Sequence, residues 1–536
     1  MQRRPSSAHL ASGSLVAGFA MLLVVLATGG LSSSFIDPDE SAHYVNTLFL
    51  GDWVRAGLPS PMVFARDYYA HFPKLSIGHW PPGWYAMLTP LFVVARPSPI
   101  AALVLSAFVA GLPAGLILWA AVRIGRWRIG VAAAVAYLLL PLVVGGARHF
   151  LLDQPVTLVV GLAAIAWVRA TERPGWRRFL LFAALAAFAP LVKGNGALIA
   201  LVPAIDIVLG RRWALLRHPS LWVSALLAMA VVGPWYWVSF QISAGGFNYA
   251  PGLDYAVLAL RANLNAIVGN IGWAGALLAL VGVGSAWTAR HDAPATARIA
   301  ALAVAILLAT LLFQSAIPVA IEERYVAPLL PWAVVLAMIG VGAIAGRGGV
   351  LPRVLAAVLA LAALLPAATN LARLPVRTDL DAPAIAARIG ARPGIWLVDG
   401  RAGGEGAVIA AAAHADRGRK RIWIARASQW LSTSDFMGRN YRVTAATPAA
   451  ARAVLDRLGV AGVVSVAERG RLAYDHSVVL RAALADPAFA SQERRFRRGA
   501  GSTLLSTRIA SVRPNAELLS TGSGSANVAT LGAALD

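Results

Sequence analysis

The chain has 536 residues, of which 58% are hydrophobic and only 13% are charged. Ordinary soluble domains carry about a quarter charged residues, so the composition excludes a soluble globular protein and indicates a polytopic membrane protein. The formal net charge of +22 would suggest nucleic acid in a soluble chain. Here many arginines fall in short loops between apolar runs, so we predict no nucleic-acid partner and assign much of the excess to topology and anionic membrane lipids.

The first apolar run covers residues 13–31 and follows Arg3 and Arg4. It has no convincing small-residue cleavage site, so we predict an uncleaved anchor whose N-terminus is cytoplasmic. Residues 32–97 then form the first external loop. Within this loop residues 81–94 are apolar but too short for a comfortable crossing, and a crossing would put the arginines of residues 123–128 outside. We therefore predict an interfacial or re-entrant helix there, on the outer side.

The segment directly after the first run predicts a helix that starts with acidic residues. Asp37 is suited to cap this helix and Glu40 to complete a capping box. Asp39 and His43 then share one helix face, and Glu40 and Tyr44 share another, since each pair is four residues apart. Capping explains Asp37 and Glu40 but leaves Asp39 and His43 unexplained. Taken alone, this segment is therefore compatible with two interpretations, a helix cap and a catalytic site.

Later apolar runs bring the expected number of membrane spans to about eleven. The ten further spans are expected at residues 98–122, 129–147, 152–168, 179–191, 194–209, 221–240, 264–287, 299–317, 325–346 and 350–370. The fifth and sixth spans of the chain form a tight hairpin whose turn faces outward. This parity leaves the chain after about residue 371 on the outer side.

From residue 373 onward the composition becomes that of a soluble domain. Residues 395–398, 421–424 and 462–466 read as buried strands, and residues 448–458 read as a helix. We therefore predict a small extracytoplasmic α/β domain over residues 373–513. The remaining residues, 514–536, are rich in Ser, Gly and Ala and are expected to be a flexible tail.

The predicted topology brings most unusual polar residues to the outer membrane boundary. These are Asp39, Glu40, His43, His79, Arg148, His149, Asp153, Lys193, Glu322, Glu323 and Arg324. Each has a structural explanation of its own, such as snorkelling at the interface, ion pairing or helix capping. Their convergence favours a site, in which cations would stabilise a phosphate leaving group while a carboxylate deprotonates an attacking hydroxyl or amine. Since nucleotide sugars are cytoplasmic, an outward-facing sugar transferase would need its donor delivered on a lipid.

Five sequence blocks resemble a known family. They are Asp39-Glu40 with His43-Tyr44, residues 79–85 (HWPPGWY), residues 148–153 (RHFLLD), residues 191–194 (LVKG) and residues 324–331 (RYVAPLLP). In this order they resemble the polytopic GT-C glycosyltransferases, in the bacterial branch related to protein O-mannosyltransferases and the lipid A aminoarabinose transferase. The resemblance covers most of residues 13–346, and it implies that residues 1–372 form a transmembrane GT-C-like catalytic domain.

The resemblance also implies roles for single residues. Asp39 would be the general base, supported by Glu40, and Asp153 would be a second acid of the same cavity. A polyprenyl-phosphate-sugar donor would have its phosphate held by basic groups. Candidate substrate-binding residues are His43, Tyr44, His79, Arg148, Lys193, Arg324 and Tyr325. The residue directly before Pro81-Pro82 is Trp80, where members of the family often carry Lys or His.

Whether the protein binds a metal ion is left open, because members of the family differ on this point and the sequence requires no cofactor. Candidate ligands for a divalent ion are Asp39, Glu40, His43 and His79, with His71 as a further histidine nearby.

The sequence therefore predicts an integral membrane glycosyltransferase that moves a sugar from a polyprenyl phosphate to a protein, lipid or glycan acceptor on the outer face of the cytoplasmic membrane. Two alternatives are a transporter or flippase of lipid-linked or acidic solutes, and a membrane scaffold whose external domain binds a partner. A transporter would place ionisable residues near the membrane midplane, whereas here the central parts of most spans are apolar.

Overall fold

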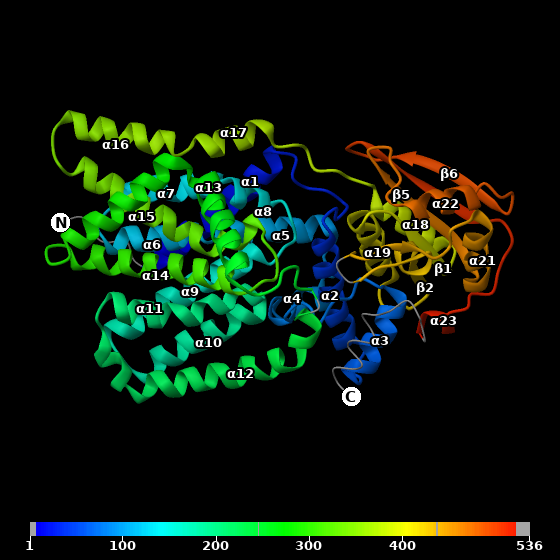
Figure 1. Cartoon of the computed structure of the whole chain (residues 1–536), viewed down its shortest axis with the longest axis horizontal. Helices are drawn as coiled ribbons and strands as arrows, with labels where there is room; N and C mark the ends of the chain where they lie inside the picture. The colour runs from blue at the N-terminus through cyan, green and yellow to red at the C-terminus, as the bar shows by residue number, and fades with distance from the viewer. Residues whose placement is uncertain (1–6, 245, 436–437, 521–536) are drawn as a thin grey trace.

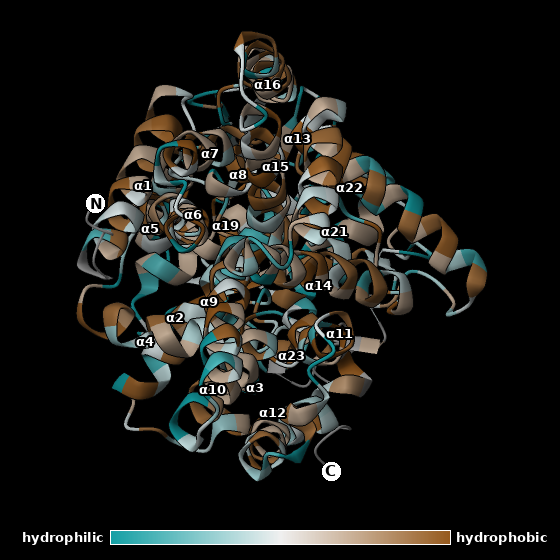
Figure 2. Cartoon of the chain, turned by 90° about the vertical axis from the view of Figure 1, so that its left-hand side faces the viewer, coloured by the Kyte–Doolittle hydropathy of each residue, from teal (hydrophilic) through white to brown (hydrophobic). Residues whose placement is uncertain are grey.

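The computed structural model describes residues 7–244, 246–435 and 438–520. It consists of a long helix bundle with a smaller sheet domain at one end, and the N-terminal helix starts at the opposite end (Figure 1). Seen from that opposite end, the helices of the bundle are hydrophobic on many outward faces (Figure 2). Large side chains of the bundle such as Trp237 and Trp273 are 86% and 80% exposed. Such a surface is stable in lipid but not in water, so the bundle is the membrane part of the chain.

Eight helical segments of the described residues are long and apolar enough to cross a membrane. They are α1 (Ser7–Ala27), α5 (Pro99–Gly111) with α6 (Ala114–Arg123), α9 (Asp153–Glu172), α12 (Pro219–Ala244), α13 (Leu253–Thr288), α14 (Pro294–Ala316), η3 (Glu323–Leu329) with α15 (Leu330–Ala345), and α16 (Val350–Ala362) with α17 (Leu365–Arg373). A ninth is possible if α7 (Trp127–Leu139) and α8 (Pro141–Ala147), bent by 60°, form one broken span.

The remaining two of the eleven predicted spans are the halves of the hairpin. These are α10 (Trp176–Val192), which has 17 residues, and the segment Gly194–Leu209, which consists of η1 (Gly194–Ala200) and α11 (Leu201–Leu209). All eleven predicted spans are therefore helical. The two hairpin halves are close to the shortest length of a full crossing, about 17 residues, and length and composition alone identify eight or nine spans among the described residues.

The first external loop folds into three short helices at the domain end of the bundle (Figure 1). They are α2 (Pro38–Arg55), α3 (Pro61–His71) and α4 (Gly83–Val94). Helix α4 is the predicted non-crossing helix; it has 12 residues and packs beside α2. A short helix η2 (Trp213–Arg217) precedes α12. The arginine-rich turns that follow α6, α9 and α11 lie at the other end of the bundle (Figure 1).

Glycines allow two of the long helices to pack backbone against backbone. A Cβ atom at Gly282 of α13 would lie 2.1 Å from the carbonyl oxygen of Leu336, and one at Gly340 of α15 would lie 2.0 Å from that of Leu278. No larger residue fits at either position without separating the helices. Small residues at helix crossings are the usual means by which membrane helices pack closely.

The sheet domain is the predicted α/β domain. Its five-stranded sheet has the order β2-β1-β5-β7-β6, in which β1 pairs in parallel with β2 and β5 while β7 pairs antiparallel with β5 and β6. The strands are β1 (Gly394–Asp399), β2 (Ile422–Arg426), β5 (Val460–Glu468), β6 (Phe489–Arg495) and β7 (Gly501–Arg508), with a small hairpin of β3 (Ser432–Thr433) and β4 (Arg442–Val443). The three predicted strands and the predicted helix at 448–458 are confirmed as β1, β2, β5 and α21 (Pro448–Leu458).

Helices cover both faces of this sheet. Trp396 and Val398 of β1 belong to the core shared with the bundle, whereas Ile395 and Leu397 face the separate core of the domain. The bundle side carries α18 (Ala382–Ala391) and α19 (Ala402–Asp416); the other helices are α20 (Ala427–Trp430), α21 and α22 (Asp475–Ala483). The predicted tail begins with the short helix α23 (Glu517–Ser520), and its residues 521–536 lie outside the described residues.

Helix α19 docks directly onto the start of α2, and glycines make this contact possible. A Cβ atom at Gly403 would lie 2.0 Å from the carbonyl oxygen of Ile36, and one at Gly406 would lie 2.1 Å from Oγ of Ser41. The sheet domain is thus held against the acidic segment by backbone-level contact. The position of the domain over the bundle depends on these glycines.

Substitution of Gly403 tests this docking. Because its neighbour is backbone rather than a flexible side chain, Gly403→Ala should force α19 away from α2 and destabilise the protein by about 1–3 kcal/mol, as overpacking does. Thermal unfolding in detergent or nanodiscs measures the effect. Gly390→Ala in α18 is the matched control, since a Cβ atom there would meet nothing within 4 Å; equal stability of the two variants would contradict the docking role.

Candidate active site

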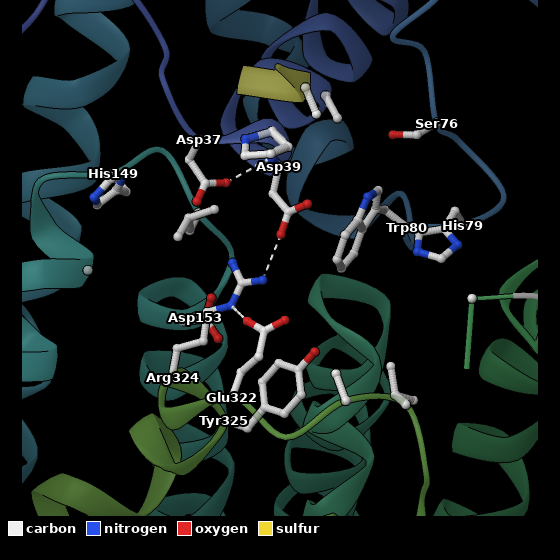
Figure 3. Close-up of a pocket in the computed structure, with 18 of the residues that line it drawn as sticks. Asp37, Asp39, Ser76, His79, Trp80, His149, Asp153, Glu322, Arg324 and Tyr325 are labelled. Carbon is white, nitrogen blue, oxygen red and sulfur yellow. Dashed lines mark hydrogen bonds and ion pairs between the residues drawn. The ribbon is translucent and has the colours of Figure 1, made fainter. Parts of the chain in front are cut away.

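A cavity of about 750 Å³ lies where the bundle meets the sheet domain. Its walls come from the start of α2, residues 73–80, the α7–α8 turn with the start of α9, residues 319–327, and the sheet domain through Ala402 and Arg426. Figure 3 shows the bundle side of this cavity, where Asp39 from α2 and Arg324 from the start of η3 point toward one another and Trp80 and His79 lie to one side. The cavity therefore exists only when both parts of the chain are assembled.

Asp39 projects into this cavity and is bound by Arg324 (Figure 3). Its Oδ2 accepts a hydrogen bond of 2.7 Å from Nη2 of Arg324, whose Nε also donates to Glu322. Among the described residues, Oδ1 of Asp39 accepts no hydrogen bond, and the side chain is 26% exposed. One oxygen is thus fixed by a cation while the other is available to a ligand in the cavity.

The charge of Arg324 also determines the protonation state of Asp39. Burial by itself would raise the pKa of Asp39, but the nearby positive charges, of which Arg324 contributes most and also donates a hydrogen bond, lower the pKa below the ordinary carboxyl value. Asp39 is therefore ionised at neutral pH, as a group that accepts a proton must be.

A second acid–base pair lies beside the first. Lys193, at the end of α10, donates a hydrogen bond of 2.5 Å from Nζ to Oδ1 of Asp153 at the start of α9. The Lys193 ammonium also lies 4.9 Å from the centre of the Tyr325 ring. Oδ2 of Asp153 is buried and accepts no hydrogen bond from the described residues. Three predicted site residues from separate segments, Asp153, Lys193 and Tyr325, therefore lie together.

His43 and His79 lie on the wall that carries Trp80. His43 is buried; its Nδ1 is 2.7 Å from the hydroxyl of Tyr85, and its ring packs edge-on against Trp80 with centroids 4.9 Å apart. Burial lowers the pKa of His43 to about 3 and, despite the charge of Asp39, also lowers that of His79. Both are neutral at pH 7, so neither supplies the positive charge expected for a phosphate ligand. His79 and Trp80 line the cavity, whereas His43 supports Trp80 from behind.

Glu40 lies behind the cavity, at the start of α2. The capping box is confirmed, since Asp37 accepts from the Asp39 backbone and Glu40 accepts from the Asp37 backbone at 3.0 Å. Glu40 also accepts from Nη2 of Arg377 at 2.7 and 2.8 Å and from the Phe150 backbone at 2.9 Å. It is 0% exposed and is not among the residues that line the cavity. Its carboxylate is fully engaged, so the structure gives it a positioning rather than a chemical role.

Two further predicted residues also face away from the cavity. Tyr44 donates to the carbonyl of Pro97 at 2.6 Å and lies 2.7 Å from Nδ1 of His414 in α19. Arg148 donates to the carbonyl of Pro375 at 2.5 Å, on the segment that leads into the sheet domain. Both residues therefore bind the sheet domain and its linker instead of a ligand. The two faces predicted for α2 are real: Asp39 and His43 face the cavity wall, and Glu40 and Tyr44 face the domain.

The candidate metal ligands are not gathered into one site. Within residues 7–244, 246–435 and 438–520, no three His, Asp or Glu side chains are arranged to hold a metal ion. Glu40 is saturated by Arg377, and His43 is engaged with Tyr85. His71 packs against Trp423 of the sheet domain with ring centroids 4.9 Å apart.

Three residues that matter for the site were not singled out from the sequence. Lys74 and Arg426 line the cavity, and Arg377 binds Glu40. A signal for Lys74 exists, because the chain has only three lysines, Lys74, Lys193 and Lys420, against 44 arginines. Arg377 and Arg426 are inconspicuous among the many arginines, and only the fold brings them to the first external loop.

Comparison with known proteins agrees with this architecture. The dolichyl-phosphate-mannose-protein mannosyltransferase family matches residues 80–237. ArnT from Cupriavidus metallidurans bound to undecaprenyl phosphate is 14% identical, with a TM-score of 0.56 over 95% of this chain and 99% of that chain. In the apo state it is 15% identical, with a TM-score of 0.57 over 92% and 98% of the two chains. Comparison with curated protein sequences gives no match.

Archaeal proteins are also similar. AglB, the oligosaccharyltransferase from Archaeoglobus fulgidus, in complex with an inhibitory peptide and a dolichol-phosphate, is 12% identical with a TM-score of 0.51 over 91% of this chain and 74% of that chain. The A. fulgidus oligosaccharyltransferase complex with zinc and sulfate is 14% identical with a TM-score of 0.52, over 84% and 67%. At these identities the likeness is one of fold, and the GT-C fold predicted from the sequence is confirmed.

The Glu40–Arg377 pair can be tested by removing the cation. Arg377→Met leaves Glu40 as a buried and uncompensated charge, which should cost about 3–5 kcal/mol in stability. Thermal unfolding measures the loss, and Arg388→Met is the control because Arg388 is exposed and makes no ion pair with described residues. The double variant Glu40→Leu/Arg377→Met should recover part of the loss. An unchanged melting temperature of Arg377→Met would contradict the pair's structural role.

Proposed function

We propose that this protein is an integral membrane glycosyltransferase that transfers a sugar from a polyprenyl-phosphate-linked donor to an acceptor outside the cytoplasm. The observation that carries the proposal is the geometry of Asp39. It is an ionised carboxylate with one oxygen held by Arg324 and the other open to a cavity at the membrane boundary. A base and a phosphate-binding cation side by side are what transfer from a glycosyl phosphate requires.

In the proposed reaction Asp39 acts as the general base. Its free Oδ1 takes the proton from an acceptor hydroxyl or amine, and the oxygen or nitrogen attacks the anomeric carbon of the sugar. The bond between that carbon and the phosphate oxygen breaks, and its electron pair leaves with the phosphate. The lipid phosphate thereby gains one negative charge, which Arg324 and Lys193 would stabilise.

The donor class is proposed from the charges of the cavity and from the relatives. Arg324 begins the η3–α15 span and Lys193 ends α10, so both cations lie where a membrane helix reaches the surface. The phosphate of a lipid-linked donor can reach these cations at the membrane surface while the lipid chain of the donor stays in the bilayer. The family whose model matches is that of the dolichyl-phosphate-mannose-protein mannosyltransferases, and one ArnT structure holds undecaprenyl phosphate. Which hexose or pentose is moved is not part of the proposal.

Asp153 and Trp80 are proposed as sugar-binding residues. The unpaired Oδ2 of Asp153 is an acceptor for a sugar hydroxyl, and a buried acceptor without a partner is unfavourable until a ligand supplies one. Trp80 contributes a rigid apolar surface to the same cavity, as ligand sites commonly do.

The site and the sheet domain are proposed to lie on the periplasmic side of an inner membrane. The arginine-rich turns at the opposite end of the bundle support this orientation through the positive-inside rule. A transporter function is less well supported, because the acid–base pairs of the cavity lie at one end of the bundle and not at its centre.

Replacement of the proposed base is the first test. Asp39→Asn removes the proton acceptor but keeps the side-chain shape, and transfer should fall by about 10²–10⁴-fold, the usual contribution of general base catalysis. A radiolabelled polyprenyl-phosphate-sugar assay with fractionated acceptors measures it. Asp37→Asn is the control, since asparagine caps a helix as well as aspartate does. Near-normal transfer by Asp39→Asn, with unchanged thermal stability, would remove Asp39 from the role of base.

The pH dependence tests the influence of Arg324 on that base. In the wild type the charge of Arg324 lowers the pKa of Asp39, so the acid limb of the rate profile should lie below about pH 4, the ordinary carboxyl value. Arg324→Gln removes this charge while burial continues to raise the pKa, so the limb should move to higher pH. The residual rate of the variant is followed from pH 4 to 8, and an unmoved acid limb would contradict the coupling.

A further inference from the structure

We propose that Lys74 and Arg426 form a second anion site, on the wall closed by the sheet domain, which binds a phosphate group of the acceptor. This inference deepens the proposed function and rests on it, because it divides the cavity between donor and acceptor. It also gives the sheet domain a direct part in substrate recognition.

Lys74 is a cation without a protein partner. It lines the cavity, and within the described part of the chain its ammonium makes neither a hydrogen bond nor an ion pair. Its stem passes over Gly406 of α19, where a Cβ atom would lie 3.2 Å from Cε of Lys74. The sheet domain thus shapes the path of this side chain. Lys193, by contrast, is already paired with Asp153.

Arg426 presents its guanidinium to the same cavity from the end of β2. Its Nε donates to Oε2 of Glu405 at 2.8 Å, and the hydroxyl of Ser428 also donates to Glu405 at 3.1 Å. This arrangement fixes the guanidinium, which is 18% exposed. Its two terminal nitrogens make no hydrogen bond to the described residues, so they are available to an anion. A fixed arginine with a nearby lysine is a typical phosphate-binding combination.

The two cationic groups come from different parts of the cavity wall. Arg324 belongs to the bundle, whereas Arg426 belongs to the sheet domain and Lys74 to the segment between α3 and α4. A lipid-linked phosphate approaches from the membrane and meets Arg324, while a group that approaches from the domain side meets Lys74 and Arg426.

The size of the cavity agrees with this division. About 750 Å³ is within the range of pockets that enclose a drug-sized ligand, which leaves room for a sugar and for part of an acceptor. The first turn of α19 reaches the wall at Ala402, and the positive end of its helix dipole adds to the favourable potential there.

The test uses the full-length protein in nanodiscs with two probes, polyprenyl phosphate for the membrane-side site and inorganic phosphate for the proposed one. Inorganic phosphate is titrated with polyprenyl phosphate at saturation, so that the membrane-side site is filled. Lys74→Gln should weaken phosphate binding at least 10-fold and leave the affinity for polyprenyl phosphate unchanged. Lys74→Arg should retain phosphate binding. Lys420→Gln is the control, because this third lysine is paired with Asp67 outside the cavity.

Each other outcome has a definite meaning. Unchanged phosphate affinity in Lys74→Gln overturns the inference, and so does a loss of polyprenyl phosphate affinity, which would assign Lys74 to the donor. If the wild type does not bind polyprenyl phosphate at all, the proposed function fails, whatever inorganic phosphate does.

A pH series separates a bound anion from a structural effect. Burial and the charge of Arg426 lower the pKa of Lys74 to about 8, although Glu405, Asp39 and Asp37 act in the opposite direction. Lys74 loses its charge above that pH, so phosphate affinity of the wild type should fall between pH 7 and 9 relative to that of Lys74→Arg, which stays charged. Parallel pH profiles of the two proteins would contradict a direct contact.

Discussion

The buried ion pair between Glu40 and Arg377 is the contact on which the geometry of the site depends. Glu40 accepts hydrogen bonds from Asp37, Phe150 and Arg377, so one carboxylate joins the start of α2, the segment before α9 and the linker to the sheet domain. Although burial opposes its ionisation, the charge of Arg377 holds the pKa of Glu40 far below the ordinary value. A charge so deeply buried is tolerated only because every lone pair is used.

This constraint determines where the neighbouring residue points. Successive residues of a helix are turned by about 100°, so a Glu40 fixed toward the domain directs Asp39 toward the cavity. The same helix thus carries a structural acid and a chemical acid side by side. The close contact of Gly403 with Ile36 holds the domain at this point, and the domain in turn closes the cavity above Asp39.

The cavity contains charges that are already paired with one another. Arg324 binds Asp39, and Lys193 binds Asp153. Pairing keeps these ions stable in a partly desolvated place while no ligand is bound. A phosphate can share the same cations without rebuilding the site, because the free oxygen of Asp39 and the terminal nitrogens of Arg426 remain available. Such preorganisation lowers the cost of stabilising charge as it develops.

The sequence predicts those features of the site that depend on residues close together in the chain, but not the contacts between residues far apart in it. The cap of α2 and its two faces follow from residues three or four apart, and the cations at Lys193 and Arg324 follow from the order of spans and loops. The partner of Glu40 lies 337 residues away, and no local pattern indicates it. Arg148 is at the expected boundary, but its guanidinium turns toward Pro375, a direction set by the linker. Hydrophobicity predicts both hairpin helices as spans but does not give their depth in the membrane.

The most direct test of the account is a structure of the full-length protein with polyprenyl phosphate bound. The account predicts the lipid phosphate inside the cavity, within hydrogen-bond distance of Arg324 or Lys193, with Oδ1 of Asp39 facing the position that the sugar would occupy. A phosphate bound elsewhere on the bundle, with Asp39 remote from it, would contradict the assignment of this cavity as the place of sugar transfer.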